Sequence, residues 1–197
     1  MKVLLVIGHQ NRSKTSFCHA IARTAVEGLR GGGHEVSYHD LYEEEFDPIL
    51  PHEEIPKGAK RPPAIEAHCR EVTAADGFVV VHPNWWGQPP AVLKGWVDRV
   101  FCEGVAFEFG EGGEVVELLR GKRAVVFTTS NTPREIELER FGDPLENLWK
   151  NCIFRFCGVT DFYRRNFESI VMSTPQQRRE WLDEVRRVIA QHFPPGA

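Results

Sequence analysis

The segment GFVVVHPNWWGQPPAVLKGWVDRVF, residues 77–101, joins an apolar run of strand length to a helical pattern through a loop rich in proline and tryptophan. The run from Gly77 to His82 is typical of a strand buried on both faces of a parallel sheet. Pro90 is predicted at the first helical position. The apolar face of this helix would consist of Leu93, Trp96, Val97, Val100 and Phe101. Because proline fixes φ and lacks an N–H group, the loop is stiff, and we expect it to hold something flat.

The same alternation of strand and helix runs through the rest of the chain. We predict four further strands at residues 2–8, 35–41, 123–129 and around 167–172. Helical patterns are found at 17–29, with a stop at glycines 31–33, then at 64–75, from Asp143 to near Gly158, and after Thr174. Residues 42–63 are expected to form an irregular excursion. Strands alternating with helices predict right-handed crossovers onto one parallel sheet.

Composition narrows the class of protein. A chain of 197 residues with 42% hydrophobic content is long enough for one α/β domain, residues 1–197. The net charge of −4 provides no basic face for nucleic acid, and no apolar run is long enough to span a bilayer. The chain starts with a strand pattern rather than a signal peptide, so we expect a cytoplasmic location.

The cysteines and the clusters of charged residues do not indicate a special site. The five cysteines, Cys18, Cys69, Cys102, Cys152 and Cys157, lack CxxC spacing. We therefore expect reduced thiols rather than a disulfide framework or a zinc site, and no bound metal. Arginines gather from Arg164 to Arg187 and acids from Glu43 to Glu54; we interpret both as solvated faces, with a docking patch as the alternative.

In a doubly wound sheet, ligands bind beyond the carboxyl ends of the strands, and three loops there are candidates: 9–16, 83–89 and 128–132. The first contains neither the G-x-G-x-x-G of dinucleotide sites nor a Walker sequence. It has instead Ser13, Thr15 and Ser16 before a helix N-terminus, where hydroxyl and N–H groups can bind phosphate. Ordinary N-capping is the alternative.

The other two loops favour a planar ligand with a polar edge. Trp85 and Trp86 can form a wall against a ring, although a buried structural pair is the alternative. The sequence TTSNT at 128–132 suits the polar edge of a heterocycle, or a simple turn. A phosphate cradle, an aromatic wall and a polar edge together describe flavin mononucleotide, FMN.

These segments resemble the flavodoxin-like NAD(P)H:quinone oxidoreductases, the family of DT-diaphorase and of the potassium-efflux ancillary oxidoreductase. The similar stretches are GH and TSF after the first strand, DLYEEEFDPIL after the second, residues 74–101, and the TT that closes the fourth, over roughly residues 3–132. The resemblance implies an α/β, flavodoxin-like three-layer sandwich with a five-stranded parallel sheet in the order 2-1-3-4-5.

The resemblance also implies which residues surround the flavin. The positions that match phosphate contacts are His9, Thr15, Ser16, Phe17 and Cys18. Those that match the bed of the isoalloxazine ring are Pro83, Asn84, Trp85, Trp86 and Gly87, and those facing its N1 and O2 atoms are Thr128, Thr129, Ser130 and Asn131. No tyrosine or histidine lies between Thr128 and Asn151 to match the proton relay of the mammalian members, so no catalytic residue is assigned. The short connection after DLY favours FMN, with FAD as the alternative.

The expected activity is two-electron hydride transfer from NAD(P)H to a quinone-like acceptor, with ping-pong kinetics. The alternatives are an accessory flavoprotein that docks on a membrane transporter of the potassium-efflux type, and a flavodoxin-like electron carrier. We also expect a homodimer, because the helix at 90–101 resembles the family's dimer contact. In the alternative reading, Trp96 and Phe101 fill the core of their own protomer.

Overall fold

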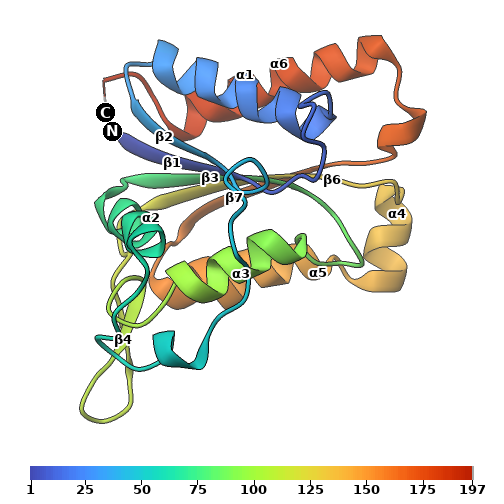
Figure 1. Ribbon diagram of the computed structural model, residues 1–197. Helices are drawn as coiled ribbons and strands as arrows, with labels where there is room; N and C mark the ends of the chain where they lie inside the picture. The colour runs from blue at the N-terminus through green and yellow to red at the C-terminus, as the bar shows by residue number, and fades with distance from the viewer. Residues whose placement is uncertain (197) are drawn as a thin grey trace.

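The computed structural model describes residues 1–196 and is built on a parallel sheet of five strands (Figure 1). Its strands are β1 (Lys2–Ile7), β2 (Glu35–Asp40), β3 (Gly77–Pro83), β6 (Arg123–Thr129) and β7 (Asp161–Phe167), in the order β2-β1-β3-β6-β7. The two remaining strands, β4 (Phe107–Phe109) and β5 (Val115–Glu117), pair as a separate antiparallel hairpin. The predicted order 2-1-3-4-5 did not count this hairpin, so the numbering differs from the prediction.

Helices cover both faces of the sheet (Figure 1). One layer holds α1 (Phe17–Gly31) and α6 (Pro175–His192), and the other holds α2 (Pro63–Ala74), α3 (Ala91–Val100) and α5 (Pro144–Asn147). α5 continues as π and 3₁₀ turns, η3 (Leu148–Phe154) and η4 (Arg155–Cys157), up to Gly158. The short turns are η1 (His52–Glu54), α4 (Arg134–Ile136), η2 (Glu137–Phe141) and η5 (Ile170–Met172). Each face of the sheet has its own apolar core.

The last strand lies earlier in the chain than predicted. Residues 161–167 form β7, and Ile170–Met172 form a 3₁₀ turn, so the strand predicted around 167–172 was wrong. β7 is an edge strand with mostly half-buried side chains, and its sequence DFYRRNF lacks the apolar run that marks a buried strand. Ser169, at a φ of 52°, turns the chain away after the strand ends.

The apolar face of α3 packs inside its own chain. Trp96 is 1% exposed and Phe101 is 8% exposed. The indole N–H of Trp96 donates to Nδ1 of His68, on α2, at 3.2 Å. The alternative reading of these two aromatic residues is therefore correct, and the expected subunit contact cannot rest on them.

The excursion after β2 is fixed against α3. The buried guanidinium of Arg99 donates to the carboxylate of Glu54 at 2.6 and 3.0 Å and to the carbonyl of Asp47 at 2.7 Å. Gly95 lies so close to Pro48 that a Cβ atom at this position would overlap the Pro48 backbone. Because removing one partner of a buried ion pair leaves an uncompensated charge, Arg99 and Glu54 hold this irregular segment firmly.

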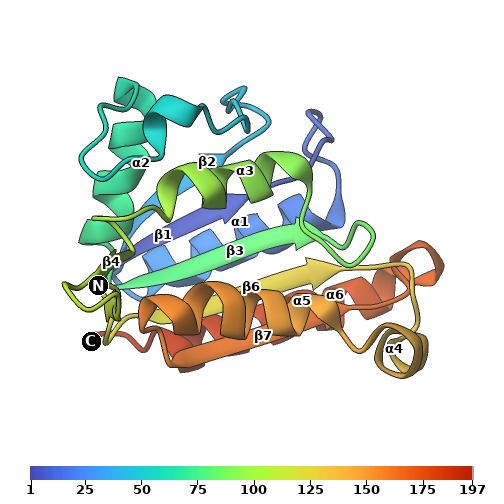
Figure 2. The same cartoon turned by 90° about the horizontal axis from the view of Figure 1, so that it is seen from below.

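The strands give the molecule two different ends. Their carboxyl ends lie beside α4, whereas the N-terminus and the β4–β5 hairpin lie at the opposite end (Figures 1 and 2). Among residues 1–196, no helix has both the length and the apolar character required to cross a bilayer. The cysteines in this part of the chain are all free thiols.

Candidate functional site

A cavity of about 680 Å³ lies at the carboxyl edge of the sheet. It is lined from the loops after β3 and β6 and from the turn between α4 and α5, three segments whose places in the fold Figure 2 shows. Five of the residues that line it were predicted from the sequence: Asn84, Trp86, Gly87, Ser130 and Asn131. The lining also includes three residues of η2 that were not predicted: Glu137, Arg140 and Phe141. The cavity therefore brings the second and third predicted loops together.

The loop with the two tryptophans closes as a tight turn. Trp85 and Gln88 exchange two backbone hydrogen bonds of 2.9 and 3.0 Å, and Trp86 and Gly87 between them have φ angles of 56° and 72°. Positive φ at both central residues is type I′ geometry, which a bulky residue rarely adopts. The side chain of Trp86 is fully exposed, and Trp85 is 48% exposed, which excludes the buried pair. A strained, exposed indole at a cavity wall suits a site where a ligand covers it.

Asn84 connects this turn to β6 and to η2. Its N–H donates to the carbonyl of Thr129 at 2.6 Å, and its Oδ1 accepts the N–H of Gly87 at 2.9 Å. Nδ2 must then be the atom that donates to Oε1 of Glu137, at 3.1 Å. Glu137 is 4% exposed. A buried carboxylate is thus held by a hydrogen bond at the wall of the cavity.

The residues that end β6 point mainly inward. Thr128 is fully buried, and its hydroxyl donates to Oδ1 of Asn166 at 2.9 Å. Nδ2 of Asn166 in turn donates to Oγ of Ser130 at 3.1 Å. These hydrogen bonds fix the start of the loop after β6. Asn131, the next residue of this loop, lines the cavity.

The loop after β1 is ordered by Asn11. Its Oδ1 accepts the N–H and the hydroxyl of Ser13 at 3.0 and 2.5 Å, and its Nδ2 donates to the hydroxyl of Thr15 at 3.1 Å. Lys14 between them has a positive φ of 58°. Both hydroxyls are therefore used within an Asx-type turn, and the backbone N–H groups of the following helix are the better candidates for binding phosphate.

Ser16 is the N-cap of α1, as the alternative reading proposed, and its Oγ accepts the N–H of His19 at 3.3 Å. The N–H groups of Phe17 and Cys18 have no acceptor within the helix, because the first turn has none to offer. Sγ of Cys18 lies 3.3 Å from the hydroxyl of Thr129, which joins the first loop to the end of β6. Burial raises the pKa of the Cys18 thiol to about 12, so this residue is neutral at pH 7.

Three other predicted residues, Phe17, Pro83 and His9, make contacts within the protein itself. The ring of Phe17 lies in the core, 5.8 Å from that of Phe167, and Pro83 is the buried last residue of β3. His9 accepts the N–H of Asn11 on its Nδ1 at 3.0 Å. Burial and the nearby His19 lower the pKa of His9 to about 4, so its side chain is neutral at pH 7.

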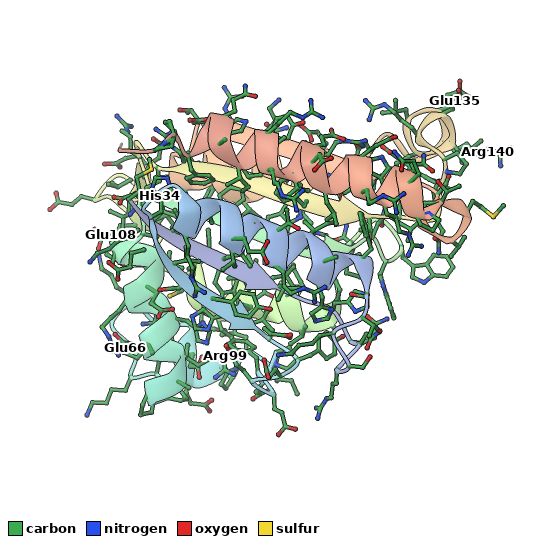
Figure 3. The ribbon with its side chains drawn as sticks, turned by 90° about the horizontal axis from the view of Figure 1, so that it is seen from above. His34, Glu66, Arg99, Glu108, Glu135 and Arg140 are labelled. Carbon is green, nitrogen blue, oxygen red and sulfur yellow. The ribbon has the colours of Figure 1, made fainter. Side chains whose placement is uncertain are left out.

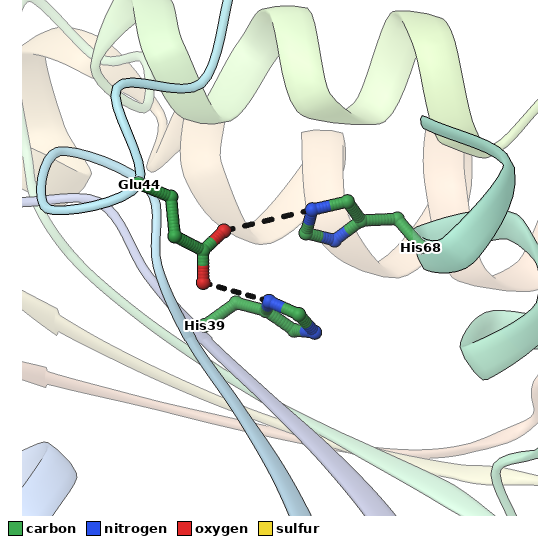
Figure 4. Close-up of side chains that lie close together, drawn as sticks. All are labelled: His39, Glu44 and His68. Atoms are coloured by element: carbon green, nitrogen blue, oxygen red, sulfur yellow. Dashed lines mark hydrogen bonds and ion pairs between the residues drawn. The ribbon is translucent and has the colours of Figure 1, made fainter. Parts of the chain in front are cut away.

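A second cluster of polar side chains lies away from the cavity, where His39 of β2 and His68 of α2 meet Glu44 (Figure 4). Their ligand-type atoms lie within 4.8 Å of one another, as in a metal site. An indole N–H can only donate, so the contact with Trp96 occupies the Nδ1 lone pair of His68 and leaves the proton of the neutral ring on Nε2, facing Glu44. Since a metal would need the Nε2 lone pair, we interpret the cluster as a hydrogen-bond network.

Sequence reasoning missed Glu137 and Arg140 because they belong to no strand end and match no motif. They lie in η2, between the loop after β6 and the helix start at Asp143 and Pro144. Arg140 lies near Glu135 at the α4 corner of the molecule (Figure 3). The helix start at Asp143 and Pro144 was predicted. It was the one sequence signal that the chain turns back toward the cavity after η2.

Known proteins resemble this chain over nearly its whole length. A family model described as flavodoxin-like fold matches residues 1–193. A protein of Haemophilus influenzae named uncharacterized NAD(P)H oxidoreductase is 32% identical over 187 residues, which cover 93% of this chain and 91% of that protein. Ribosyldihydronicotinamide dehydrogenase (quinone) of Mus musculus is 32% identical, with 92% and 87% covered. The crystal structure of Smu.1420 from Streptococcus mutans has a TM-score of 0.84 and 31% identity, with 97% and 100% covered.

Proposed function

The chain belongs to the flavodoxin-like fold family, and on this basis we propose that it is a flavin-dependent NAD(P)H:quinone oxidoreductase. It would transfer two electrons as a hydride from NAD(P)H to a quinone-like acceptor. The observation that carries the proposal is Trp86, a strained and fully exposed indole at the wall of a cavity on the carboxyl edge of the sheet. The names of the relatives, an NAD(P)H oxidoreductase and a ribosyldihydronicotinamide dehydrogenase (quinone), support this activity.

The residues present fit FMN, with FAD as the alternative. The N–H groups that open α1 would hold the phosphate, and Trp86 would lie against the ring. The N–H of Asn84 donates to Thr129 of β6, and those of Trp85 and Gly87 are used inside the loop. Within residues 1–196 the N–H of Trp86 has no protein acceptor and is free to meet the ring edge. When bound, the flavin supplies a ring that accepts a hydride and passes it on.

The chain itself contributes orientation and charge. With Trp86 against the ring, Phe141 provides apolar surface beside which the nicotinamide and the acceptor can lie in turn. Asn84 holds Glu137 in place at the wall, and Arg140 offers a positive charge to a phosphate or to an oxygen-rich acceptor. One cavity that serves donor and acceptor in succession implies ping-pong kinetics.

The proposal is tested first by the absorption spectrum of the purified protein and by mass analysis of the chromophore released on heating. We expect a flavin spectrum and the mass of FMN. Protein that stays colourless after incubation with excess FMN or FAD would contradict the proposal. Intersecting lines in steady-state kinetics with NAD(P)H and a quinone would contradict the shared cavity.

We further propose that the chain acts in the cytoplasm as one domain and as a homodimer, with the cavity near the interface. The large exposed apolar side chains of this end support a subunit contact: Trp86, Leu138, Phe141, Val171 and Met172. Sedimentation at the mass of one chain, 22.5 kDa, would refute the homodimer. The alternative is docking on a membrane transporter, and it would be favoured by co-purification with such a transporter together with absence of quinone turnover by the free protein.

A further inference from the structure

A second cavity, of about 660 Å³, lies beside α4, η2, α5 and η3 and reaches β7. Its lining differs in kind from that of the first cavity. Leu138 is its one apolar side chain among residues 1–196, and three carboxamides, Asn147, Asn151 and Asn166, contribute to the wall. This lining gives no stacking surface for a flavin, a nicotinamide or a quinone, so the cavity suits a small, strongly polar ligand.

Cations outnumber carboxylates by one at this cavity, in a chain whose net charge is −4. Five cations line it: Arg134, Lys150, Arg155, Arg164 and Arg165. Four carboxylates lie within 4.0 Å of them: Asp143, Glu146, Glu168 and Glu184. Arg155 is exposed and has no ion pair within the described residues. The site therefore keeps one positive charge without a partner.

Arg164 is the buried member of this set. Its side chain is 3% exposed. Within residues 1–196 only Nη1 has partners, Oδ2 of Asp143 at 2.8 Å and Oε2 of Glu146 at 3.6 Å. Nε and Nη2 are buried, and neither has a hydrogen-bond partner among residues 1–196. Because unmade hydrogen bonds of a buried guanidinium are costly, Arg164 itself is short of acceptor oxygens, although the carboxylates of Asp143 and Glu146 also line the cavity.

We propose that this cavity is a binding site for a small phosphate-bearing anion, separate from the flavin site. A phosphoryl group supplies several acceptor oxygens and at least one negative charge, which matches the surplus cation, and arginine binds it through a two-pronged contact. Arg155 and Lys150 at the opening would meet the anion first, and Arg164 would supply charge from below. The η2 segment separates the two sites, since Glu137 and Arg140 line the first cavity while Leu138 lines the second.

The test is calorimetric titration of the flavin-loaded protein with inorganic pyrophosphate at low ionic strength. We expect saturable binding of one ion per chain and about tenfold weaker binding by Arg155→Ala, which corresponds to 1.4 kcal/mol. Arg186→Ala is the matched control, because Arg186 is exposed on α6, outside the cavity, and pairs with Asp183. It should bind pyrophosphate like the parent protein, and both variants should retain flavin.

A second variant and a second probe sharpen the test. Arg164→Lys keeps the charge but loses the planar fork, so we expect about tenfold weaker binding here too. ADP should bind no more tightly than pyrophosphate, because the cavity offers no wall for an adenine ring. Titration without saturation, or equal weakening by Arg155→Ala and Arg186→Ala, would overturn the proposal. If Arg164→Lys does not fold, the comparison of Arg155→Ala with Arg186→Ala still decides it.

Discussion

Trp86 combines a backbone in the left-handed region with a fully exposed indole. Neither property stabilises the folded chain, since the backbone conformation costs on the order of 1–3 kcal/mol and the side chain buries nothing. A glycine, such as the neighbouring Gly87, adopts a positive φ without this cost. A tryptophan at such a position is therefore best explained by a contact made outside the protein itself.

We predict that Trp86→Ala separates flavin affinity from stability. Loss of stacking and burial should weaken flavin binding by about 1–3 kcal/mol, or roughly 5- to 150-fold. The free energy of unfolding of the flavin-free protein should change by less than about 0.5 kcal/mol, because the side chain is exposed. Fluorescence titration with FMN and urea unfolding measure the two quantities. Phe109→Ala, at a half-exposed aromatic residue of the hairpin, is the control and should retain flavin normally.

Glu137→Gln should make the reduction potential of the bound flavin more positive. The substitution removes a buried negative charge from the wall while keeping an acceptor for Asn84, so the reduced ring is destabilised less. A shift of about 30 mV is expected, equivalent to 1.4 kcal/mol for two electrons. Spectroelectrochemical titration measures the shift, and Glu135→Gln, at an exposed acid nearby, provides the comparison. Equal reduction potentials in the two variants would show that the charge of Glu137 does not act on the flavin.

Single residues of the site were predicted unevenly from the sequence. Trp86, Gly87 and Asn131, which line the cavity, were among the predicted residues because they follow strand ends, where the fold directs ligands. Thr128 was placed on the right loop, but its side chain turns inward to Asn166, which a loop pattern cannot reveal. Glu137 follows no strand end, so its place at the cavity depends on tertiary packing alone.

At the scale of elements, His39 ties β2 to the turn after it and to α2. Its ring contacts the carboxylates of Glu44, at 2.8 Å, and of Glu71. Burial lowers the pKa of His39, but the hydrogen bonds to Glu44 and Glu71 outweigh it, so the pKa is raised above its ordinary value. The pKa of His68 is lowered by burial and by the neighbouring His39.

The stabilisation provided by His39 should disappear at high pH. A raised pKa in the folded state means that the contribution is complete below the unfolded pKa of about 6.5 and is lost as pH rises through the folded value. The difference in unfolding free energy between the parent protein and His39→Gln should therefore shrink with rising pH. Urea unfolding between pH 6 and pH 9 measures it, with His52→Gln as the exposed control. A difference that does not vary with pH would show that the network is not linked to protons. His68, with its lowered pKa, opposes folding as pH falls below about 6.5.

The turn after β3 and the start of α5 touch at Gly87. This residue has a φ of 72°, and a Cβ atom there would lie 2.7 Å from Cγ of Pro144. Gly113, in the hairpin, has a φ of 83° and no atom within 4 Å of such a Cβ. Gly113→Ala should destabilise the protein by about 1 kcal/mol through its backbone alone. Gly87→Ala should lower the free energy of unfolding by more, because the loop must also move away from Pro144. Equal losses of unfolding free energy in the two variants, measured with urea, would mean that the turn and α5 are not in tight contact.

Elements whose ends carry a capping signal were predicted more reliably than elements without one. The helix at 143–158 has Asp143 as N-cap and ends at Gly158, as predicted, because capping is encoded in neighbouring residues. The π turns within η2 and η3 and the hairpin at 107–117 had no such local signal. β7 was misplaced because an edge strand need not be apolar throughout.

At the scale of the whole molecule, the parallel sheet determines where ligands bind. All five strands point the same way, so the loops that follow β1, β3 and β6 meet at one edge. The contact between Cys18 and Thr129 joins the first of these loops to the third. This convergence was predictable because it depends on topology, whereas the second cavity was not, since it forms between helices and β7.

Flavin removal should lower the stability of the whole protein. A ligand that binds only the folded state stabilises it by about 2.7 kcal/mol at 100 times its dissociation constant. For a chain of this length, this corresponds to a rise in melting temperature of roughly 5–10 °C when FMN is added to flavin-free protein. Scanning calorimetry with and without FMN measures the rise. An unchanged melting temperature would mean that FMN does not bind the folded chain.

The β4–β5 hairpin lies at the end of the molecule opposite the cavity, as the positions of Glu108 and Arg140 also show (Figure 3). Its tip contains Gly112 and Gly113, neither of which is part of a strand. A linker inserted at this tip would attach the protein to an electrode with the redox pocket facing the solution. Immobilised in this way, every molecule would present the same aperture to dissolved substrate, and current could be read from an oriented monolayer.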